Sequence, residues 1–387
     1  NSFLMNPPNI WTQVGPDNVP LQSDGTKRGI GRVNTIAFHP SDPDKIYVGA
    51  PAGGFWKSDN GGQTWATTTD FLSNLGVSDI AINPNNPDEI YIITGDRDGG
   101  DTYSFGLMKS VDGGSTFNTT GLSFNITSYY KGNRVLIDPN NTSIIIVSTS
   151  NGIYRSVDAG ATFVNTYSGI NMTDIEFHTT SSFIIYGASK GSTSIYKSID
   201  NGITWSQSGN GLPPTNDVVR ACVAVTPDNP QVVYAMFGGN NNGFYGVYKS
   251  SDEGVTWTQQ ANSPNLLGWS STGSDSDGQA WYDLAFAVSP NDENILFVGG
   301  VNTWKSIDGG VNWSLNTHWT GSGGADYMHA DEHMIKYNPL NGDIYSGNDG
   351  GLYYSTDEVN WTDISDGLHI SQFYSLGVSQ SVQNKVI

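Results

Sequence analysis

Residues 110–117 read SVDGGSTF, and the chain repeats this pattern along most of its length. The leading serines of successive copies lie 42 to 56 residues apart. Self-similarity at such a period is typical of a protein built from repeated structural units. The other copies are SDNGGQTW (58–65), SVDAGATF (156–163), SIDNGITW (198–205), SSDEGVTW (250–257), SIDGGVNW (306–313) and a shortened STDEVNW (355–361).

The repeated pattern has the chemistry of a tight turn between two strands. Glycine supplies a positive φ, and the aspartate can accept hydrogen bonds from the amides of the turn. Serine and threonine can bond to the same backbone, and the final aromatic residue can pack between neighbouring units. Folding therefore accounts for every position of the motif.

Before each copy, the chain contains two apolar runs separated by Pro, Asn and Asp, which is a hairpin signature. With the strands on either side of the motif, each unit is expected to hold four antiparallel strands. The paired runs are 35–49, 79–95, 134–148, 174–188, 221–236, 284–300 and 333–347.

The motif resembles the Asp-box, or BNR repeat, of sialidases, two-propeller xyloglucanases and sortilin-like receptors. This resemblance, together with the fixed period, implies an all-β fold: a β-propeller of four-stranded antiparallel blades. We expect seven blades, with eight as the alternative if the N-terminal strand closes the ring. Because the same motif serves enzymes and receptors, it does not fix an activity.

The expected domain is one propeller over residues 1–370, in which 1–29 form an N-terminal strand and lead-in. Residues 371–387 resemble the first strands of a further blade, which predicts that the chain is part of a longer protein. A second propeller, or adhesive and sorting modules, could follow on the same polypeptide.

Composition limits the classes of partner. The formal net charge is −20, with 37 acidic against 17 basic residues, which disfavours nucleic acid and anionic membranes. No apolar run approaches the roughly 20 residues of a membrane span. The single cysteine, Cys222, lies in the apolar run VVRACVAV and is expected to be a buried core residue. We expect a secreted or cell-surface protein.

Binding residues are expected on the face opposite the repeated turns, where the connecting loops vary in length. Two acidic loops there, DRDGGD (96–101) and DSDG (275–278), place oxygen ligands at alternate positions, as Ca²⁺ requires. They make Ca²⁺ a candidate cofactor, and the alternative is that both are ordinary turns. The candidate ligands are Asp96, Asp98, Asp101, Asp275 and Asp277.

The segment HADEH (329–333) holds the densest group of histidine and acidic side chains in the chain. If it is extended, His329, Asp331 and His333 point to one side, where they could bind a transition metal or perform acid–base catalysis. The alternative is a structural role in hydrogen bonding between blades. Asp349, in GNDGG of the same repeat, completes the set of catalytic candidates.

Four aromatic residues in the long polar loops could stack on sugar rings. They are the candidate ligand-binding residues Trp269, Trp281, Trp319 and Tyr327.

Nearly the whole chain is similar to secreted bacterial Asp-box proteins related to the xyloglucanase and sortilin-like groups, with a Bacteroidetes-like appearance. The stretches that carry this similarity include GRVNTIAFHPSDPDKIYVGAPAGGFWKSDNGG, HADEHMIKYNP and GNDGGLYYS. In the xyloglucanase group, a catalytic aspartate precedes paired glycines in the first blade, where this chain has Pro51. Sialidases need an arginine triad and an F/Y-R-I-P stretch, which this chain lacks.

These observations favour a binding propeller for a polysaccharide or a protein partner. One alternative is a xyloglucanase-like glycoside hydrolase that uses carboxylates among Asp96, Asp98, Asp275, Asp331 and Asp349. Another is a subunit or cargo of a bacterial surface or secretion assembly.

Overall fold

The computed structural model describes residues 16–372, except for positions 22, 24–26, 73 and 192–193. Strands dominate this part of the chain, and its helical content is a single 3-10 turn, η1 (Ile126–Ser128). Residues 1–15 of the expected N-terminal strand and lead-in, and the expected strands after residue 372, lie outside the described residues.

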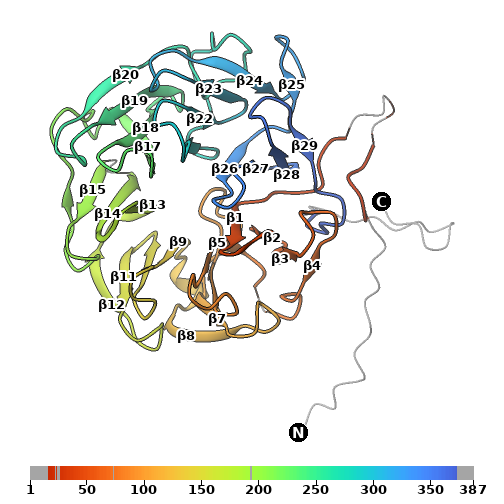
Figure 1. Cartoon of the computed structure of the whole chain (residues 1–387), viewed down its shortest axis with the longest axis vertical. Coiled ribbons are helices and arrows are strands. Elements are labelled where there is room, and N and C mark those ends of the chain that lie inside the picture. Colours follow the sequence, from red (N-terminus) through yellow and green to blue (C-terminus); the bar gives the residue numbers. More distant parts are fainter. Residues whose placement is uncertain (1–15, 22, 24–26, 73, 192–193, 373–387) are drawn as a thin grey trace, which may run out of the picture.

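Strands consecutive in sequence form antiparallel sheets arranged around a central axis (Figure 1). The first three four-stranded sheets hold β1 (Thr35–His39), β2 (Asp42–Ala50), β3 (Gly54–Ser58) and β4 (Ala66–Thr67); β5 (Val77–Ile82), β6 (Ile90–Thr94), β7 (Gly106–Ser110) and β8 (Asn118–Ser123); and β9 (Gly132–Ile137), β10 (Ile145–Thr149), β11 (Gly152–Ser156) and β12 (Val164–Ser168).

Two further groups of four are joined by a single strand pairing, in which Lys190 of β14 is opposite Arg220 of β17. Their strands are β13 (Asn171–His178), β14 (Ser181–Lys190), β15 (Ile195–Ser198) and β16 (Ser206–Gln207), then β17 (Val218–Val225), β18 (Val233–Gly239), β19 (Phe244–Ser250) and β20 (Thr258–Ala261).

The remaining sheets hold β21 (Ala285–Val288), β22 (Leu296–Gly299), β23 (Thr303–Ser306), β24 (Ser314–His318) and β25 (Asp326–Tyr327), then β26 (Glu332–Tyr337), β27 (Ile344–Asn348), β28 (Gly351–Ser355) and β29 (Thr362–Asp363). The short β25 pairs in parallel with β24. This all-β architecture is the one expected from the repeat.

The repeated motif forms the turn between the third and fourth strands of each group. In SVDGGSTF, the Ser110 hydroxyl accepts from the Gly114 amide at 2.9 Å and donates to Asp112 at 2.8 Å. Asp112 also accepts from the amide of Thr116 at 2.9 Å and from its hydroxyl at 2.7 Å. These bonds confirm the role in folding that the sequence predicts.

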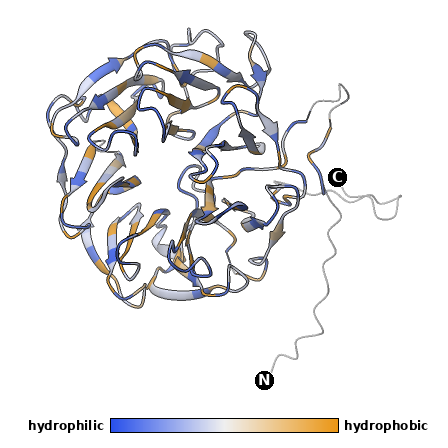
Figure 2. Ribbon diagram, in the orientation of Figure 1, coloured by the Kyte–Doolittle hydropathy of each residue, from blue (hydrophilic) through white to orange (hydrophobic). Residues whose placement is uncertain are grey.

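The hydrophobic core is divided among clusters that lie between neighbouring sheets. One cluster joins Tyr234 and Val247 to Leu296 and Trp304 of the next group, and Cys222 is buried in it as predicted. Hydrophobic residues concentrate on the strands and hydrophilic residues in many of the turns (Figure 2).

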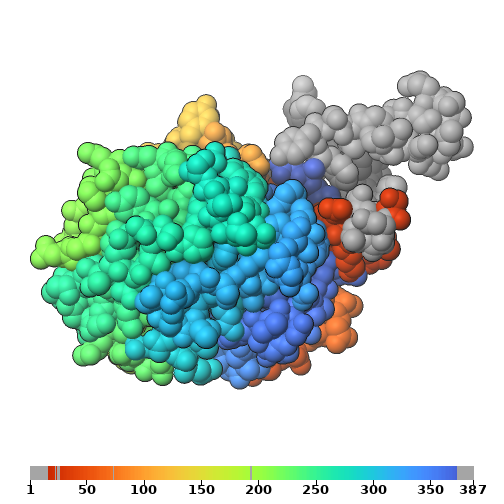
Figure 3. All heavy atoms as spheres, turned by 90° about the horizontal axis from the view of Figure 1, so that it is seen from above, coloured from red at the N-terminus to blue at the C-terminus, as the bar shows by residue number. Residues whose placement is uncertain are grey.

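The first and last described segments meet. Val33 donates to Asn348 O at 3.0 Å, and Val19 donates to Asp366 at 2.9 Å. A shared cluster packs Ile36 and Val48 against Leu352 and Leu368. Figure 3 shows residues near the start of the chain (red) against blue residues near its end, on a body that is wider than it is thick.

Candidate functional site

Polar side chains gather where the innermost strands begin, on the face opposite the repeated turns. They come from the β6–β7 and β27–β28 connections and from the segments that lead into β1, β21 and β26. The sequence predicts a binding face at these same connections.

His333, on β26, is the centre of this cluster. Its Nδ1 lies 3.1 Å from Asp98 Oδ2, and its Nε2 lies 2.9 Å from Asp349 Oδ1. Burial opposes a charge on the imidazole, but the hydrogen bonds to Asp349 and Asp98 outweigh it and raise the pKa of His333 to about 9. At neutral pH, His333 is therefore a buried imidazolium that joins two carboxylates.

Asp98 anchors the inner side of this arrangement. It is buried and forms ion pairs with Arg220 and with Arg97, whose Nε lies 3.3 Å from Asp98 Oδ2. Burial would raise the pKa of Asp98, yet Arg220, Arg97 and His333 together hold it well below its usual value. Asp98 is thus permanently ionised and fixes the orientation of the imidazole ring.

Asp349 is on the outer side, with its side chain 27% exposed. The Tyr282 hydroxyl lies 2.8 Å from Oδ2 and 3.0 Å from Oδ1. Burial opposes ionisation, but the hydrogen bond and charge of His333, with Arg32 and Tyr282, lower the pKa of Asp349. Asp349 is consequently a carboxylate that solvent can reach and that stays ionised.

Arg32 connects Tyr282 to the β6–β7 loop. Its guanidinium donates to the Tyr282 hydroxyl at 3.1 Å and to Asp96 at 2.6 Å, and it lies 5.4 Å from the Tyr282 ring centroid. Asp96 also accepts from Asn34 at 3.1 Å. This network restrains the phenol that contacts Asp349.

The pKa of Asp331 is shifted in the direction opposite to that of Asp349. Burial and then the negative charge of Asp349 raise its pKa, while His333 and His329 partly offset this. Gln279 Nε2 donates to Asp331 Oδ1 at 3.1 Å. The cluster therefore contains two carboxyl groups whose pKa values are displaced in opposite directions.

HADEH is not extended throughout, which was the condition for His329, Asp331 and His333 to point to one side. Asp331 has a φ of 69°, in the left-handed region, and β26 begins only at Glu332. The left-handed residue breaks the alternation, so His333 reaches Asp98 and Asp349, whereas His329 Nδ1 contacts the neighbouring Ala330 O at 3.1 Å. Backbone strain of this kind is common at functional sites.

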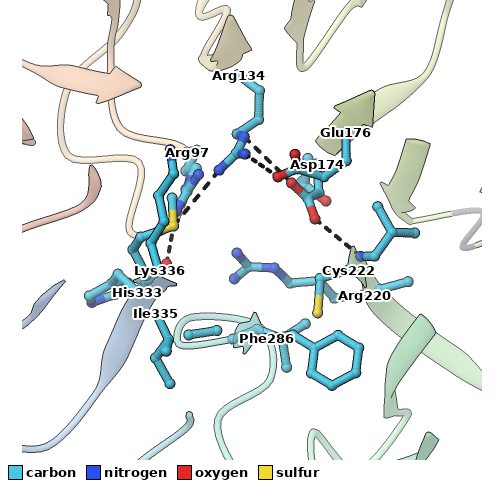
Figure 4. A pocket seen from close by; sticks show the side chains of 16 residues that line it. Arg97, Arg134, Asp174, Glu176, Arg220, Cys222, Phe286, His333, Ile335 and Lys336 are labelled. Carbon is cyan, nitrogen blue, oxygen red and sulfur yellow. Dashed lines mark hydrogen bonds and ion pairs between the residues drawn. The ribbon is translucent and has the colours of Figure 1, made fainter. Parts of the chain in front are cut away.

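Beneath the cluster is a narrow cavity of about 80 Å³ in the central channel (Figure 4). Arg134 crosses one side of it and lies 2.5 Å from Glu176, 3.4 Å from Asp79 and 3.5 Å from Asp174. The Arg220 guanidinium points into the space. A cavity of this size holds a few water molecules and no sugar ring, so a polymeric ligand would have to lie across the mouth.

Three of the four predicted aromatic residues are exposed: Trp269 by 37%, Trp281 by 48% and Trp319 by 40%. Trp281 precedes Tyr282 and lies 5.3 Å from it between ring centroids. Trp269 and Trp319 are near each other, because Trp269 O is 3.2 Å from the ring of His318, which stacks on Trp319. Tyr327 is only partly exposed.

The predicted calcium loops hold other contacts. Asp96 and Asp98 face arginine side chains, and Asp101 lies 3.5 Å from Arg32. Asp275 accepts from the Ser270 amide at 2.5 Å, and the Asp277 side chain is exposed. Within the part of the chain that the structure describes, no group of three or more His, Cys, Asp or Glu side chains is arranged to hold a metal ion. Calcium stays a prediction.

Several residues of this site were absent from the predicted catalytic set: Arg32, Arg97, Arg220, Tyr282 and the fully buried Asp283, which follows Tyr282. Tyr282 and Asp283 follow the predicted Trp281 directly, so their position in a long loop was a usable signal. The arginines gave none, because their convergence depends on which strand ends meet across the channel.

No protein-family model matches the chain. Xyloglucanase Xgh74A of Acetivibrio thermocellus is 26% identical over 350 residues, which cover 78% of this chain and 40% of that protein. A Paenibacillus xyloglucanase is 27% identical over 336 residues, 75% of this chain and 32% of its own length. The chain thus spans less than half the length of these relatives.

Among solved structures, a GH74 enzyme of Niastella koreensis superposes with a TM-score of 0.66 at 22% identity, covering 90% of this chain and 55% of that one. This likeness supports the β-propeller architecture.

Also in the described residues, no helix is long and apolar enough to cross a membrane.

Proposed function

We propose that this chain is a β-propeller of the xyloglucanase type that acts on a polysaccharide, with Asp331 as general acid and Asp349 as the ionised partner. The observation that carries the proposal is the pair of neighbouring carboxyl groups at the channel mouth whose pKa values are displaced in opposite directions. The xyloglucanase relatives, which match about three quarters of this chain, support a β-glucan substrate.

Glycoside hydrolysis needs one carboxylic acid and one carboxylate. Asp331 would donate its proton to the oxygen of the leaving sugar. Asp349, held ionised by His333 and Tyr282, would activate the attacking water or stabilise positive charge on the sugar ring. Separation of two carboxyl groups into an acid and a base by their surroundings is the general pattern in such enzymes.

Substrate contact is proposed at the exposed tryptophans. Trp281 is joined to the carboxylates through Tyr282, while Trp269 and Trp319 provide a second aromatic surface. Aromatic faces suit the apolar faces of sugar rings.

The proposal includes a ring of seven blades closed between β26–β29 and β1–β4, and a secreted or cell-surface location. It also includes the domain limits 1–370, with 371–387 leading into a further part of a longer protein.

The test is hydrolysis of xyloglucan by the full chain and by the variants Asp331→Asn and Asp349→Asn. Loss of the acid or of the ionised partner should lower kcat by about 10²–10⁴-fold, the usual contribution of an acid–base group. Release of reducing ends measures turnover, and affinity electrophoresis on the same polymer measures binding. Asp59→Asn, exposed on the opposite face, is the control and should match the parent chain.

Turnover that survives in both variants would overturn the assignment of these residues. Turnover lost with binding retained would support it.

A second candidate is a binding-only propeller, which Pro51 favours. Pro51 stands where the resembling xyloglucanases have a catalytic aspartate, and it has no side chain that can transfer a proton. In the structure it is buried, and its carbonyl accepts from Thr102 Oγ1 at 2.8 Å. Saturable binding of xyloglucan without release of reducing ends by the parent chain would favour this candidate.

A further inference from the structure

Asp283 is a buried carboxyl group to which the proposed acid–base pair gives no role. It lies at the end of the segment that leads into β21 and has no exposed surface. Its own amide donates to Gln279 O at 3.1 Å. Neither carboxyl oxygen meets the geometry of a hydrogen bond in the described part of the chain, but the Asp283 side chain is near enough to Asp331 to lower the pKa of Asp331 through hydrogen bonding. A buried polar group in this state calls for an explanation.

The charged neighbours of Asp283 shift its pKa, and Asp331 is the carboxyl group among them with the largest effect. Burial is the main cause that raises its pKa well above the usual value, and the charge of Asp331 is the second. His333 on β26 and Arg220 on β17 act in the opposite direction but are weaker. The pKa of Asp331 is in turn raised by burial and by the charge of Asp349. The charges of His333 and His329 and the Asp283 side chain lower it. Two carboxyl groups this close in a low-dielectric site cannot both be ionised at low cost.

Gln279 provides an independent geometric link between the two groups. Its side chain donates to Asp331 Oδ1 at 3.1 Å, and its backbone carbonyl accepts from the Asp283 amide at 3.1 Å. Asp283 and Asp331 are therefore fixed relative to each other by one residue, although they come from different connecting segments.

We propose that Asp283 is a positioning residue for Asp331: a fully buried carboxyl group, held near the acid by Gln279, whose proton supports the Asp331 carboxylate after proton donation. Because Asp283 has no exposed surface, it acts through Asp331 and does not touch substrate. This inference rests on the proposed function for the role of Asp331, but the protonation of Asp283 can be measured separately.

The neutral state also has a role in the reaction. Once Asp331 has given its proton to the leaving oxygen, a second negative charge would stand beside Asp349. A hydrogen bond from the neutral Asp283 to that carboxylate stabilises it without adding charge. An ionised Asp283 would instead repel it.

The first test needs no activity. If Asp283 holds its proton in the folded protein and loses it in the unfolded one, stability falls as pH rises above the ordinary aspartate range. The variant Asp283→Asn keeps a neutral hydrogen-bonding group, so its melting temperature should fall less than that of the parent chain between pH 4 and pH 7. Asp59→Asn, exposed on the other face, should follow the parent.

Infrared spectroscopy gives a direct signature. The parent chain at pH 7 should show the carbonyl stretch of a protonated carboxyl group, and Asp283→Asn should reduce it, whereas Asp59→Asn should not. Parallel melting curves together with an unchanged carbonyl band would show that Asp283 is ionised and would overturn the proposal, whatever the activity of the chain.

The second test separates positioning from packing. Asp283→Asn should retain turnover within about threefold, while Asp283→Ala, which cannot donate a hydrogen bond, should lose at least about tenfold in kcat with little change in KM. Equal loss in both variants would contradict the positioning role. If the parent chain has no turnover, the proposed function fails, and the thermal and infrared results still decide the protonation of Asp283.

Discussion

Glu332, the first residue of β26, carries a buried acid of another kind. Its carboxyl group accepts from the Ser346 hydroxyl and from Asn348 Nδ2 at 3.4 Å, and Gly299 leaves room for its Cβ and Cγ. Burial raises its pKa to about 8, although the hydrogen bonds from Ser346 and Asn348 oppose this shift. Glu332 is therefore mostly protonated at neutral pH and belongs to the packing between β22 and β26.

This gives a prediction for stability against pH. The folded chain keeps the Glu332 proton up to about pH 8, whereas the unfolded chain loses it near the ordinary glutamate value of about 4.3. Stability due to this group therefore falls as pH rises through that window. In Glu332→Gln the fall should be smaller, as measured by urea unfolding at pH 5 and pH 8. Equal losses for variant and parent between the two pH values would show that Glu332 is ionised when folded.

At the residue scale, the sequence indicated which side chains lie on the polar face but not which residues they contact. His333, Asp331 and Asp349 were named as catalytic candidates, and the structure places them in one cluster of interacting charges. Asp96 and Asp98 were expected as calcium ligands; in the structure they face arginines, and calcium binding stays a prediction. A pattern of oxygen ligands in a loop does not reveal that Arg32 and Arg220 arrive from remote segments, because that depends on how the sheets close around the channel.

At the element scale, the repeated turn depends on its serine more than on its exposed residues. Ser110 is fully buried, and its hydroxyl bonds to both the Gly114 amide and the Asp112 carboxylate. Ser115, in the same turn, is exposed and donates only to Asp112 O at 3.0 Å.

Ser110→Ala should therefore destabilise the fold by about 1–3 kcal/mol, the cost of leaving a buried amide without a partner. Ser115→Ala is the matched control and should change stability by less than about 0.5 kcal/mol. Denaturant unfolding monitored by tryptophan fluorescence measures both. Similar effects of the two substitutions would mean that the buried hydroxyl is not what holds the turn.

The elements themselves were largely predictable, because each paired apolar run in the sequence became the first two strands of a group. The failure at residues 329–333 has a local cause: Asp331 takes a left-handed conformation that alternation cannot foresee. The short parallel strand β25 was also missed, since it pairs over only two residues with β24.

At the scale of the whole molecule, charge is distributed unevenly. The chain has a net charge of −20, yet four of its six arginines, Arg32, Arg97, Arg134 and Arg220, are buried along the channel and its mouth. Each forms an ion pair with at least one aspartate there. The arginines thus stabilise the ionised state of carboxylates that burial alone would neutralise. The overall composition does not reveal this arrangement.

In the proposed function, two carboxyl groups at the mouth of the channel, with pKa values displaced in opposite directions, act together on a polysaccharide. The most direct measurement is the pH dependence of kcat/KM for xyloglucan. We expect a bell-shaped profile whose acid limb, set by Asp349, lies below the ordinary aspartate pKa and whose alkaline limb, set by Asp331, lies above it. Saturable binding without release of reducing ends at any pH would show that Asp331 and Asp349 do not form a catalytic pair.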